Sequence, residues 1–493
     1  MHLRYFPLFV LIAGLGVAAY VGASALGGSA GFPLDDAWIH HTYARSFAAT
    51  DQLAYVPGQP SAGSTSPLWT LLIAVGYRLN VDYRLWTYAL GALSLALCAW
   101  LASQLSLRLW PERRRLAWAA GLLCLFDWHL VWAAASGMET VLFAALALAV
   151  MEHAARQDLR PRDGLMLGLL GGLLTVTRPE GLLLVAMAGV VAMLRSAQHD
   201  RYMRFMLAFV AGFATPVVPA AWLNLRASGA VFPNTFYAKQ QEYAVYFSSV
   251  AAWLPRALEV LAAPFVGAQL LLLPGLLVEA IAALRRLRDR STWAYALPIV
   301  WMAAHLGVYL LRLPVVYQHG RYVIPVIPIV ILYGVHGTAR ILQKLERYRI
   351  ARPAWVGSVI VATAAFWLVG AGAYRVDVNI IENEIVASAR WIESNTPPGA
   401  LVAAHDIGAI GYFSRRPLLD LAGLVSPEVI PIIRDEAALL ALLRSREADF
   451  VAAPPNFYSP ALLDAPELEP AFEGDSPFAP EHWLVFRAKW DRQ

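Results

Sequence analysis

The chain has little charge and little cysteine for its length. Charged residues make up 15% of its 493 residues, against roughly 25% in soluble globular domains. The mean hydropathy is +0.52, which excludes an ordinary soluble protein. The formal net charge of +4 is small and does not indicate a nucleic-acid partner, because nucleic-acid binding needs a concentrated basic surface.

Several common motifs are also missing. The two cysteines, Cys98 and Cys124, both lie inside apolar runs, and they have neither the spacing of a metal site nor that of a disulfide framework. The glycine-containing segment 406–411 lacks the G-x-G-x-x-G pattern, so it predicts a turn and no dinucleotide site. Internal repeats and low-complexity linkers are absent from the sequence. Long apolar runs therefore remain the dominant signal.

These runs predict an α-helical polytopic membrane protein. A bilayer span needs about 20 apolar residues, and this window gives about eleven transmembrane helices. Several segments are short and are joined by only a few residues, so we expect half-length helices that turn near one surface. The expected spans are 5–26, 84–107, 116–134, 139–154, 164–177, 181–194, 205–225, 260–283, 293–312, 322–341 and 354–374.

Arginine-rich loops alternate with loops that carry few basic residues. By the positive-inside rule, the arginine-rich loops are cytoplasmic. We therefore expect a multi-pass protein of the cytoplasmic (inner) membrane, with its N-terminus inside and everything after residue 375 outside. A cleaved signal peptide at the first run is the alternative, but the run is long for one. The arginine-rich loops are 108–115, 156–162, 195–204, 285–290 and 340–352.

Two domains are expected. Residues 1–375 form the transmembrane catalytic domain, and its first outer loop spans 27–83. Residues 376–493 have more charge, more proline and shorter apolar runs, which predicts an extracytoplasmic α/β domain. Its strands are expected at 401–404, 417–421, 449–453 and 482–488, and its helices at 382–395 and 435–446.

Two adjacent carboxylates, Asp35 and Asp36, follow the first apolar run. Ionisable groups at a membrane boundary are costly to place, so they are candidates for chemistry. A carboxylate held near an acceptor hydroxyl acts as a general base, while an acid in front of Ala37 can also cap a helix that begins there. The two roles are compatible, and the sequence does not decide which acid is the base.

The residues after the acid pair predict a helix over 38–49 with one apolar face, lying on the membrane surface. His40 and His41 belong to this helix and are candidates to contact phosphate, to bind a metal or to face water. Further along, Ser64 or Ser66 is placed to cap the apolar helix that follows. Backbone amides at such a helix start also suit a phosphate.

Other outer loops carry groups that suit an anionic substrate. Arg178 has the planar donor fork that binds phosphate, and its alternative is a structural ion pair with Glu180. Cations that contact a leaving phosphate stabilise its developing charge. Glu139 lies where one half-helix turns into the next, and an electrostatic cap is its alternative role. The remaining candidates for substrate binding are Asn234, Lys239, His319, Arg321 and Tyr322.

Two acid or histidine positions lie deeper in the apolar segments. Asp127 and His129 belong to the third segment, where an acid faces a cavity or pairs with a partner. The partner of Asp127 is either His129 or Arg178. We expect His305 to be an interior histidine with satisfied hydrogen bonds.

The polar motifs occur in a defined order, at 35–39, 63–69, 136–140, 178–181, 233–239, 321–322, 406–412 and 420–424. This order resembles that of GT-C-fold integral membrane glycosyltransferases, and it is most similar to the branch of mycobacterial terminal arabinofuranosyltransferases. The resemblance covers most of the membrane part and part of the C-terminal domain. His40 and His41 depart from the family pattern, which has an apolar or hydroxyl residue there.

The resemblance implies an inverting hexosyl- or pentosyltransferase that uses a polyprenyl-phosphate sugar donor. The acceptor would be an extracytoplasmic glycan, lipid or protein. The family's catalytic base is the first-loop acid, which gives that role to Asp35 or Asp36. The family's phosphate-binding cations suggest Arg178, Lys239 or Arg321. Some members bind a divalent metal near the first-loop acid, but no ligand set defines a cofactor in this sequence.

Three alternatives remain open at this point. A flippase or transporter for lipid-linked sugars also uses broken helices and intramembrane charges. A non-catalytic membrane sensor would read ligands through the outer domain. A different GT-C enzyme, such as a mannosyl- or aminoarabinosyltransferase, would differ only in its donor.

Overall fold

The computed structural model describes residues 3–56, 58–156, 160–195, 199–454 and 458–490. The chain divides into two compact units, each built from separate stretches of sequence. Unit 1 consists of Met1–Tyr20, Tyr88–Ala220 and Ser248–Ala371. Unit 2 consists of Val21–Thr87, Ala221–Phe247 and Gly372–Gln493. Unit 2 therefore joins the C-terminal segment to the first outer loop. The division into two domains at residue 375 stays a prediction.

Apolar helices form the polytopic membrane part. Among the described residues, six helices are long and apolar enough to cross a membrane, or up to eight if each bent pair is one span. The predicted number of eleven is not confirmed. The predicted short segments do form helices, but α7 and α9 have 15 residues each, or roughly 22 Å, against about 30 Å for a hydrocarbon core.

The helices of this part are α1 (Phe6–Leu26), α4 (Tyr83–Leu109), α5 (Arg114–Phe126), α6 (Trp128–Ala135), α7 (Thr140–Ala154), α8 (Pro161–Thr177), α9 (Gly181–Arg195), α10 (His199–Ser228), α12 (Val250–Ala262), α13 (Gln269–Arg286), α14 (Trp293–Arg312), α15 (Tyr317–Gly320), α16 (Ile327–Lys344) and α17 (Ala351–Ile381).

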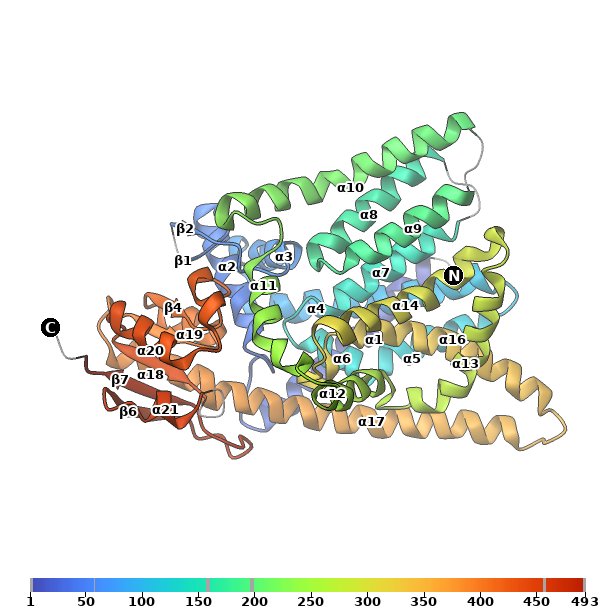
Figure 1. Ribbon diagram of the computed structural model, residues 1–493. Helices are drawn as coiled ribbons and strands as arrows, with labels where there is room; N and C mark the ends of the chain where they lie inside the picture. Colours follow the sequence, from blue (N-terminus) through green and yellow to red (C-terminus); the bar gives the residue numbers. More distant parts are fainter. Residues whose placement is uncertain (1–2, 57, 157–159, 196–198, 455–457, 491–493) are drawn as a thin grey trace. The chain divides into compact units, whose positions relative to one another are not determined.

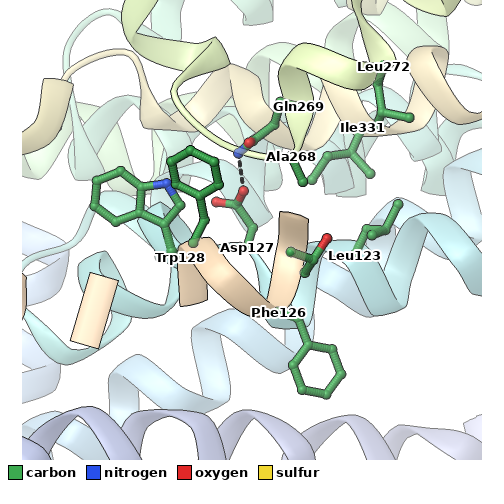
Figure 2. A pocket seen from close by; sticks show the side chains of 10 residues that line it. Leu123, Phe126, Asp127, Trp128, Ala268, Gln269, Leu272 and Ile331 are labelled. Carbon is green, nitrogen blue, oxygen red and sulfur yellow. Dashed lines mark hydrogen bonds between the residues drawn. The ribbon is translucent and has the colours of Figure 1, made fainter. Parts of the chain in front are cut away.

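Two helix pairs of unit 1 are sharply bent, and a hydrogen bond joins their breaks. The bend between α5 and α6 is 51°, and the bend before α13 is 98°. Asp127 caps α6 by accepting the amide N–H of Leu130 at 3.1 Å, and it accepts a second hydrogen bond from Gln269 at the start of α13 (Figure 2). His129 Nδ1 lies 3.9 Å from Asp127 Oδ1. His129, one of the two predicted partners of Asp127, therefore lies beside it. Gln269 is a hydrogen-bond partner that the sequence did not indicate.

Unit 2 contains a five-stranded sheet in the order β4-β3-β5-β7-β6 (orange to red in Figure 1). β3 is parallel to β4 and β5, and β7 is antiparallel to β5 and β6. The strands are β3 (Val402–Ala404), β4 (Leu418–Asp420), β5 (Phe450–Ala453), β6 (Leu468–Glu473) and β7 (Leu484–Ala488), and a separate pair is formed by β1 (Ala54–Val56) and β2 (Gln59–Pro60).

The helices of unit 2 agree with most of the sequence expectations. The helix predicted at 435–446 is confirmed by α20. The segment predicted as a helix at 382–395 is helical but does not start a new helix, because it continues α17 through a π-helical turn at Glu382–Val386. One prediction is wrong, because the segment 406–411 is not only a turn: α19 begins within it, at Gly408. The helices are α2 (Asp36–Thr50), α3 (Pro67–Arg78), α11 (Asn234–Glu242), α18 (Ala387–Asn395), α19 (Gly408–Ser414), α20 (Glu436–Ser445) and α21 (Pro460–Leu463).

In unit 1, α13 and α16 approach each other at glycines. A Cβ atom added to Gly337 would overlap the carbonyl oxygen of Gly275. Small residues permit such close backbone contact between membrane helices, which associate through packing rather than through a hydrophobic driving force. This contact fixes the spacing of the two helices.

We predict that Gly337→Ala lowers the thermal unfolding midpoint of the purified protein, because relieving the overlap costs about 1–3 kcal/mol. Gly357→Ala in α17 is the matched control, since its added Cβ meets nothing within 4 Å. The control should leave the midpoint unchanged or raise it, because alanine is the better helix former. Equal midpoints for the two variants would refute the close contact.

Candidate active site

The first predicted acid, Asp35, is held by the backbone of the C-terminal domain. Its Oδ2 accepts the amide N–H of Gly408 at 2.6 Å, and its Oδ1 accepts that of Ala409 at 2.7 Å. These amides belong to the first turn of α19, whose N–H groups have no partner within the helix. Asp35 precedes α2 but makes no side-chain cap to it. The acid therefore caps a helix from a distant part of the sequence instead of its own.

The backbone of α19 comes close enough to Asp35 to require glycine. A Cβ atom at position 408 would overlap the carbonyl oxygen of Asp35. The hydroxyl of Tyr55 in β1 donates to the carbonyl of Ile407 just before the helix, and Arg45 donates to the carbonyl of Tyr412 near its end at 3.0 Å. Residues of the first outer loop thus hold both ends of α19.

The surroundings of Asp35 change its proton affinity. Burial raises the pKa of Asp35, the negative charges of Asp406 and Asp36 raise it further, and the amides of Ala409 and Gly408 lower it, with a balance at about 8. A carboxylate with such a pKa binds a proton more strongly than a free one does, which suits a general base that works at a pH near this value. Asp36 is the first residue of α2 and is half-buried.

A histidine and two further acids form a cluster in unit 2. His405 Nδ1 lies 3.0 Å from Asp406 Oδ1, and His405 Nε2 lies 3.9 Å from Glu242 Oε1. Burial alone would lower the pKa of His405, but the hydrogen bond to Asp406 and the charges of Asp406, Glu242 and Asp420 raise it. The cluster therefore favours a protonated histidine. Sequence reasoning missed His405 and Glu242, although Glu242 lies on the same helix as Lys239.

The predicted motif 233–239 positions α11 within unit 2. The backbone N–H of Asn234 donates to the carbonyl of Ala62 at 3.0 Å, and its side chain donates to the carbonyl of Leu424 at 3.3 Å. The hydroxyl of Thr235 donates to the carbonyl of Gly63 at 3.0 Å. Asn234 thus has a structural role. Lys239 extends from the helix that these bonds fix in place, and it acts on Glu242 electrostatically.

The two histidines after the acid pair lie in the interior of unit 2. His40 Nδ1 is 3.2 Å from the hydroxyl of Thr70, and His41 Nδ1 is 2.9 Å from the hydroxyl of Tyr77. Burial lowers the pKa of His41 to about 3, so this ring is neutral. The helix predicted over 38–49 is confirmed, but its surface location is wrong, because most residues of α2 are buried. Phe32 stacks on the His41 ring at 5.2 Å, a contact that the local sequence pattern does not reveal.

Unit 1 holds the predicted arginine and its acids in one ion-pair network. Arg178 Nε lies 2.7 Å from Glu180 Oε1, and its NH1 lies 3.2 Å from Glu139 Oε1. The hydroxyl of Tyr309 donates to Glu180 and accepts from Arg178 at 3.3 Å. The structural ion pair that was the alternative for Arg178 is therefore present. The Arg178 guanidinium also lies 5.2 Å from the Tyr322 ring.

The late Arg-Tyr motif belongs to the same region of unit 1. Arg321 is buried, donates to the Tyr322 hydroxyl at 2.9 Å and lies 4.9 Å from its ring. His305 Nε2 lies 3.0 Å from the carbonyl oxygen of Tyr322, so its interior position is confirmed. The expectation of satisfied hydrogen bonds is met at this nitrogen only, because Nδ1 has no partner among the described residues. The His319 ring lies 5.3 Å from Trp128. Tyr322 thus has two arginines beside its ring.

The predicted site residues therefore fall into two groups. Unit 2 contains Asp35, Asp36, His40, His41, Asn234 and Lys239, and unit 1 contains Glu139, Arg178, Glu180, His319, Arg321 and Tyr322. Ser66 caps α3 by accepting from Trp69, which confirms its structural role.

The acids of unit 2 do not fit a divalent metal. In the part of the chain that the structure describes, no group of three or more His, Cys, Asp or Glu side chains is arranged to hold one. Both oxygens of Asp35 face N–H donors. We therefore assign no step to a metal.

The architecture of a polytopic helical part with a small α/β domain is that of the GT-C fold, as the motif order predicted. The structure is similar to ArnT from Cupriavidus metallidurans bound to undecaprenyl phosphate, with a TM-score of 0.62, 15% identity, and coverage of 99% of this chain and 98% of that chain.

Two further structures share the fold. One is the oligosaccharyltransferase AglB from Archaeoglobus fulgidus in complex with an inhibitory peptide and a dolichol-phosphate, with a TM-score of 0.57, 11% identity, and coverage of 99% of this chain and 75% of that chain. The other is the arabinofuranosyltransferase AftD from Mycobacteria, with a TM-score of 0.54 and 15% identity, of which this chain spans 42% while being covered over 100% of its own length. At these identities the similarity defines the fold alone.

Sequence comparisons add one match. A family described as a domain of unknown function (DUF8728) matches residues 347–490. No curated protein sequence matches the chain.

We predict that Asp35→Asn lowers the thermal unfolding midpoint, whereas Asp36→Asn does not. An amide offers one acceptor oxygen, so its NH₂ group would face the N–H of Gly408 or Ala409 and leave that donor unpaired, at a cost of about 1–3 kcal/mol. Thermal unfolding of both variants in the same detergent measures this difference. A loss of the same size in Asp36→Asn would refute the special role of Asp35 in binding α19.

Proposed function

We propose that the protein is an integral membrane glycosyltransferase. It transfers a sugar from a polyprenyl-phosphate donor to an extracytoplasmic glycan, lipid or protein acceptor, with inversion at the anomeric carbon. The observation that carries the proposal is the acid pair Asp35 and Asp36, of which Asp35 has a pKa raised by burial to about 8. The donor class is supported by structures of the same fold that hold undecaprenyl phosphate or dolichol-phosphate.

The reaction uses one acid of this pair as the general base. The carboxylate takes the proton of the acceptor hydroxyl, and the oxygen attacks the anomeric carbon from the face opposite the phosphate. The bond from that carbon to the phosphate oxygen breaks, so the configuration inverts and the phosphate leaves with the electron pair. Arg178, Lys239 or Arg321 stabilises the charge that develops on the phosphate.

The same proposal includes the membrane orientation. The arginine-rich loops support a cytoplasmic N-terminus in the inner membrane. Unit 2, with its acid pair, is then extracytoplasmic, where a water-soluble acceptor can reach it. A lipid-linked donor reaches the protein from the bilayer.

We predict that Asp35→Asn or Asp36→Asn, whichever removes the base, lowers the rate of sugar transfer by about 10²- to 10⁴-fold. The assay uses the full chain in liposomes, a panel of radiolabelled polyprenyl-phosphate hexoses and pentoses, and native membrane glycans as acceptors. Asp464→Asn is the matched control, because Asp464 is an exposed acid of the same unit. Its rate should equal that of the wild type.

Two results would contradict the proposal. If the protein binds a donor but transfers no sugar, and if donor binding is unchanged in both acid variants, the result favours a transporter. Transfer at the wild-type rate in both acid variants excludes an acid-pair base.

We also predict a pH dependence that identifies the base. If Asp35 takes the proton, activity rises with pH through about 8, because burial and the charge of Asp406 raise the pKa of Asp35. Asp406→Asn removes that charge, so the rising limb of kcat/KM should move to lower pH. Glu242→Gln is the control, since Glu242 faces His405 and lies outside the hydrogen bonds of Asp35. A limb that stays in place in Asp406→Asn would rule out Asp35 as the titrating base.

A further inference from the structure

Unit 1 contains a large cavity far along its helices from the Arg178 network. It has a volume of about 1040 Å³, at the upper end of the roughly 300–1,000 Å³ of small-molecule sites. Its walls come from the start of α5, the end of α16, the connection between α16 and α17, and the first turns of α17. These elements include parts of two arginine-rich loops, 108–115 and 340–352, both predicted to be cytoplasmic.

One part of this cavity is strongly basic. Five arginines line it against two glutamates. Arg349 and Arg352 are exposed, as are two arginines at the start of α5, so their charges remain available for an anion. The guanidinium fork of arginine matches the oxygens of a phosphate group better than an ammonium does. The basic residues are Arg113, Arg114, Arg115, Arg349 and Arg352.

The remainder of the cavity is lined by apolar side chains that recur at helical spacing along two helices. α5 contributes Leu116, Ala119 and Leu122, and α17 contributes Val356 and Val359. Both sets repeat at three to four residues, so each forms one face of its helix. An apolar floor with a basic rim suits an amphiphile with an anionic head and hydrocarbon chains, and it does not suit a small polar anion.

Two polar atoms in the cavity walls lack partners. Within the described residues, Thr338 Oγ1 and Trp355 Nε1 have no hydrogen-bond partner and are shielded from solvent. Both residues line the cavity. Thr338 is buried, with a relative exposure of 6%. Thr338 Oγ1 lies against the backbone of Gly275 in α13, so these two atoms belong to the packing behind the cavity wall and take no part in binding an occupant.

We propose that this cavity binds one anionic phospholipid, with its phosphate on the five arginines and its acyl chains along α5 and α17. Basic pockets between membrane helices on the cytoplasmic side bind anionic lipid head groups through the same forces. The site is separate from the acid pair and from the Arg178 network. The bound lipid stabilises the packing of α5, α16 and α17.

The test titrates phosphatidylglycerol into the full-length protein in detergent and follows the bound lipid by native mass spectrometry. The double variant Arg349→Gln/Arg352→Gln should bind at least tenfold more weakly than the wild type. The control is Arg285→Gln/Arg288→Gln, which removes two exposed arginines from another arginine-rich loop that does not line the cavity. The control should bind like the wild type.

Parallel arms use phosphatidylcholine, inorganic phosphate and undecaprenyl phosphate. The proposal requires that phosphatidylglycerol binds, that phosphatidylcholine binds at least tenfold more weakly, and that inorganic phosphate does not displace the lipid. Tighter binding of inorganic phosphate or of undecaprenyl phosphate than of phosphatidylglycerol would overturn the assignment. Equal losses in the two arginine variants would also overturn it, because they would reflect overall charge.

A second variant covers the case in which the double arginine variant fails to fold. Val356→Trp fills the apolar part of the cavity and keeps every arginine. It should lower phosphatidylglycerol binding by a similar factor, and the thermal stabilisation by this lipid should shrink with it. Unchanged binding in Val356→Trp would refute the placement of the acyl chains.

Discussion

The arrangement of unit 2 depends on two hydrogen bonds, from the backbone amides of Gly408 and Ala409 to the carboxylate of Asp35. They join the loop after α1 to the first turn of α19, and they supply partners for amides that the helix leaves unsatisfied. They also keep the neighbouring Asp406 close enough for its charge to act on Asp35. These two hydrogen bonds therefore fix where Asp35 lies, while burial and the charges of Asp406 and Asp36 raise its pKa.

The basic group of unit 1, Arg178, is held by charged side chains, whereas Asp35 is held by backbone amides. Arg178 is neutralised by Glu139 and Glu180, and the hydroxyl of Tyr309 connects it further to Glu180. Removing one partner from a buried ion pair is strongly destabilising, because it leaves an uncompensated charge. A phosphate that binds Arg178 must therefore share the guanidinium with these carboxylates or replace one of them, and such exchange makes the binding of an anion sensitive to its geometry.

The chemistry of the sequence revealed much of this architecture, and tertiary contacts account for what it did not reveal. Apolar length and arginine distribution predicted a polytopic protein, but the number of spans depends on bends such as the one at Asp127, whose partner Gln269 is 142 residues away. The acid pair was evident from its position. The burial of His41 was not, because Phe32 and Tyr77 cover it only in the folded chain.

The same distinction applies to the smaller elements. The sequence pattern does not predict β6, because two glutamates and a proline interrupt its few apolar residues. In the described sheet, β6 pairs along its length only with β7. The sequence pattern predicts a turn at α19, because its seven residues are too few to show a helical period. His405 and Glu242 were missed because their proximity comes from two segments that are 163 positions apart in the sequence.

The sequence separation of Asp35 from its amide partners has a consequence during synthesis of the protein. The two are 373 residues apart, which at about 5–20 residues per second corresponds to roughly 20–75 s of translation. During that interval the loop after α1 exists without the helix that it will cap. The cap that Asp35 provides for α19 therefore forms late, after the ribosome has completed most of the chain.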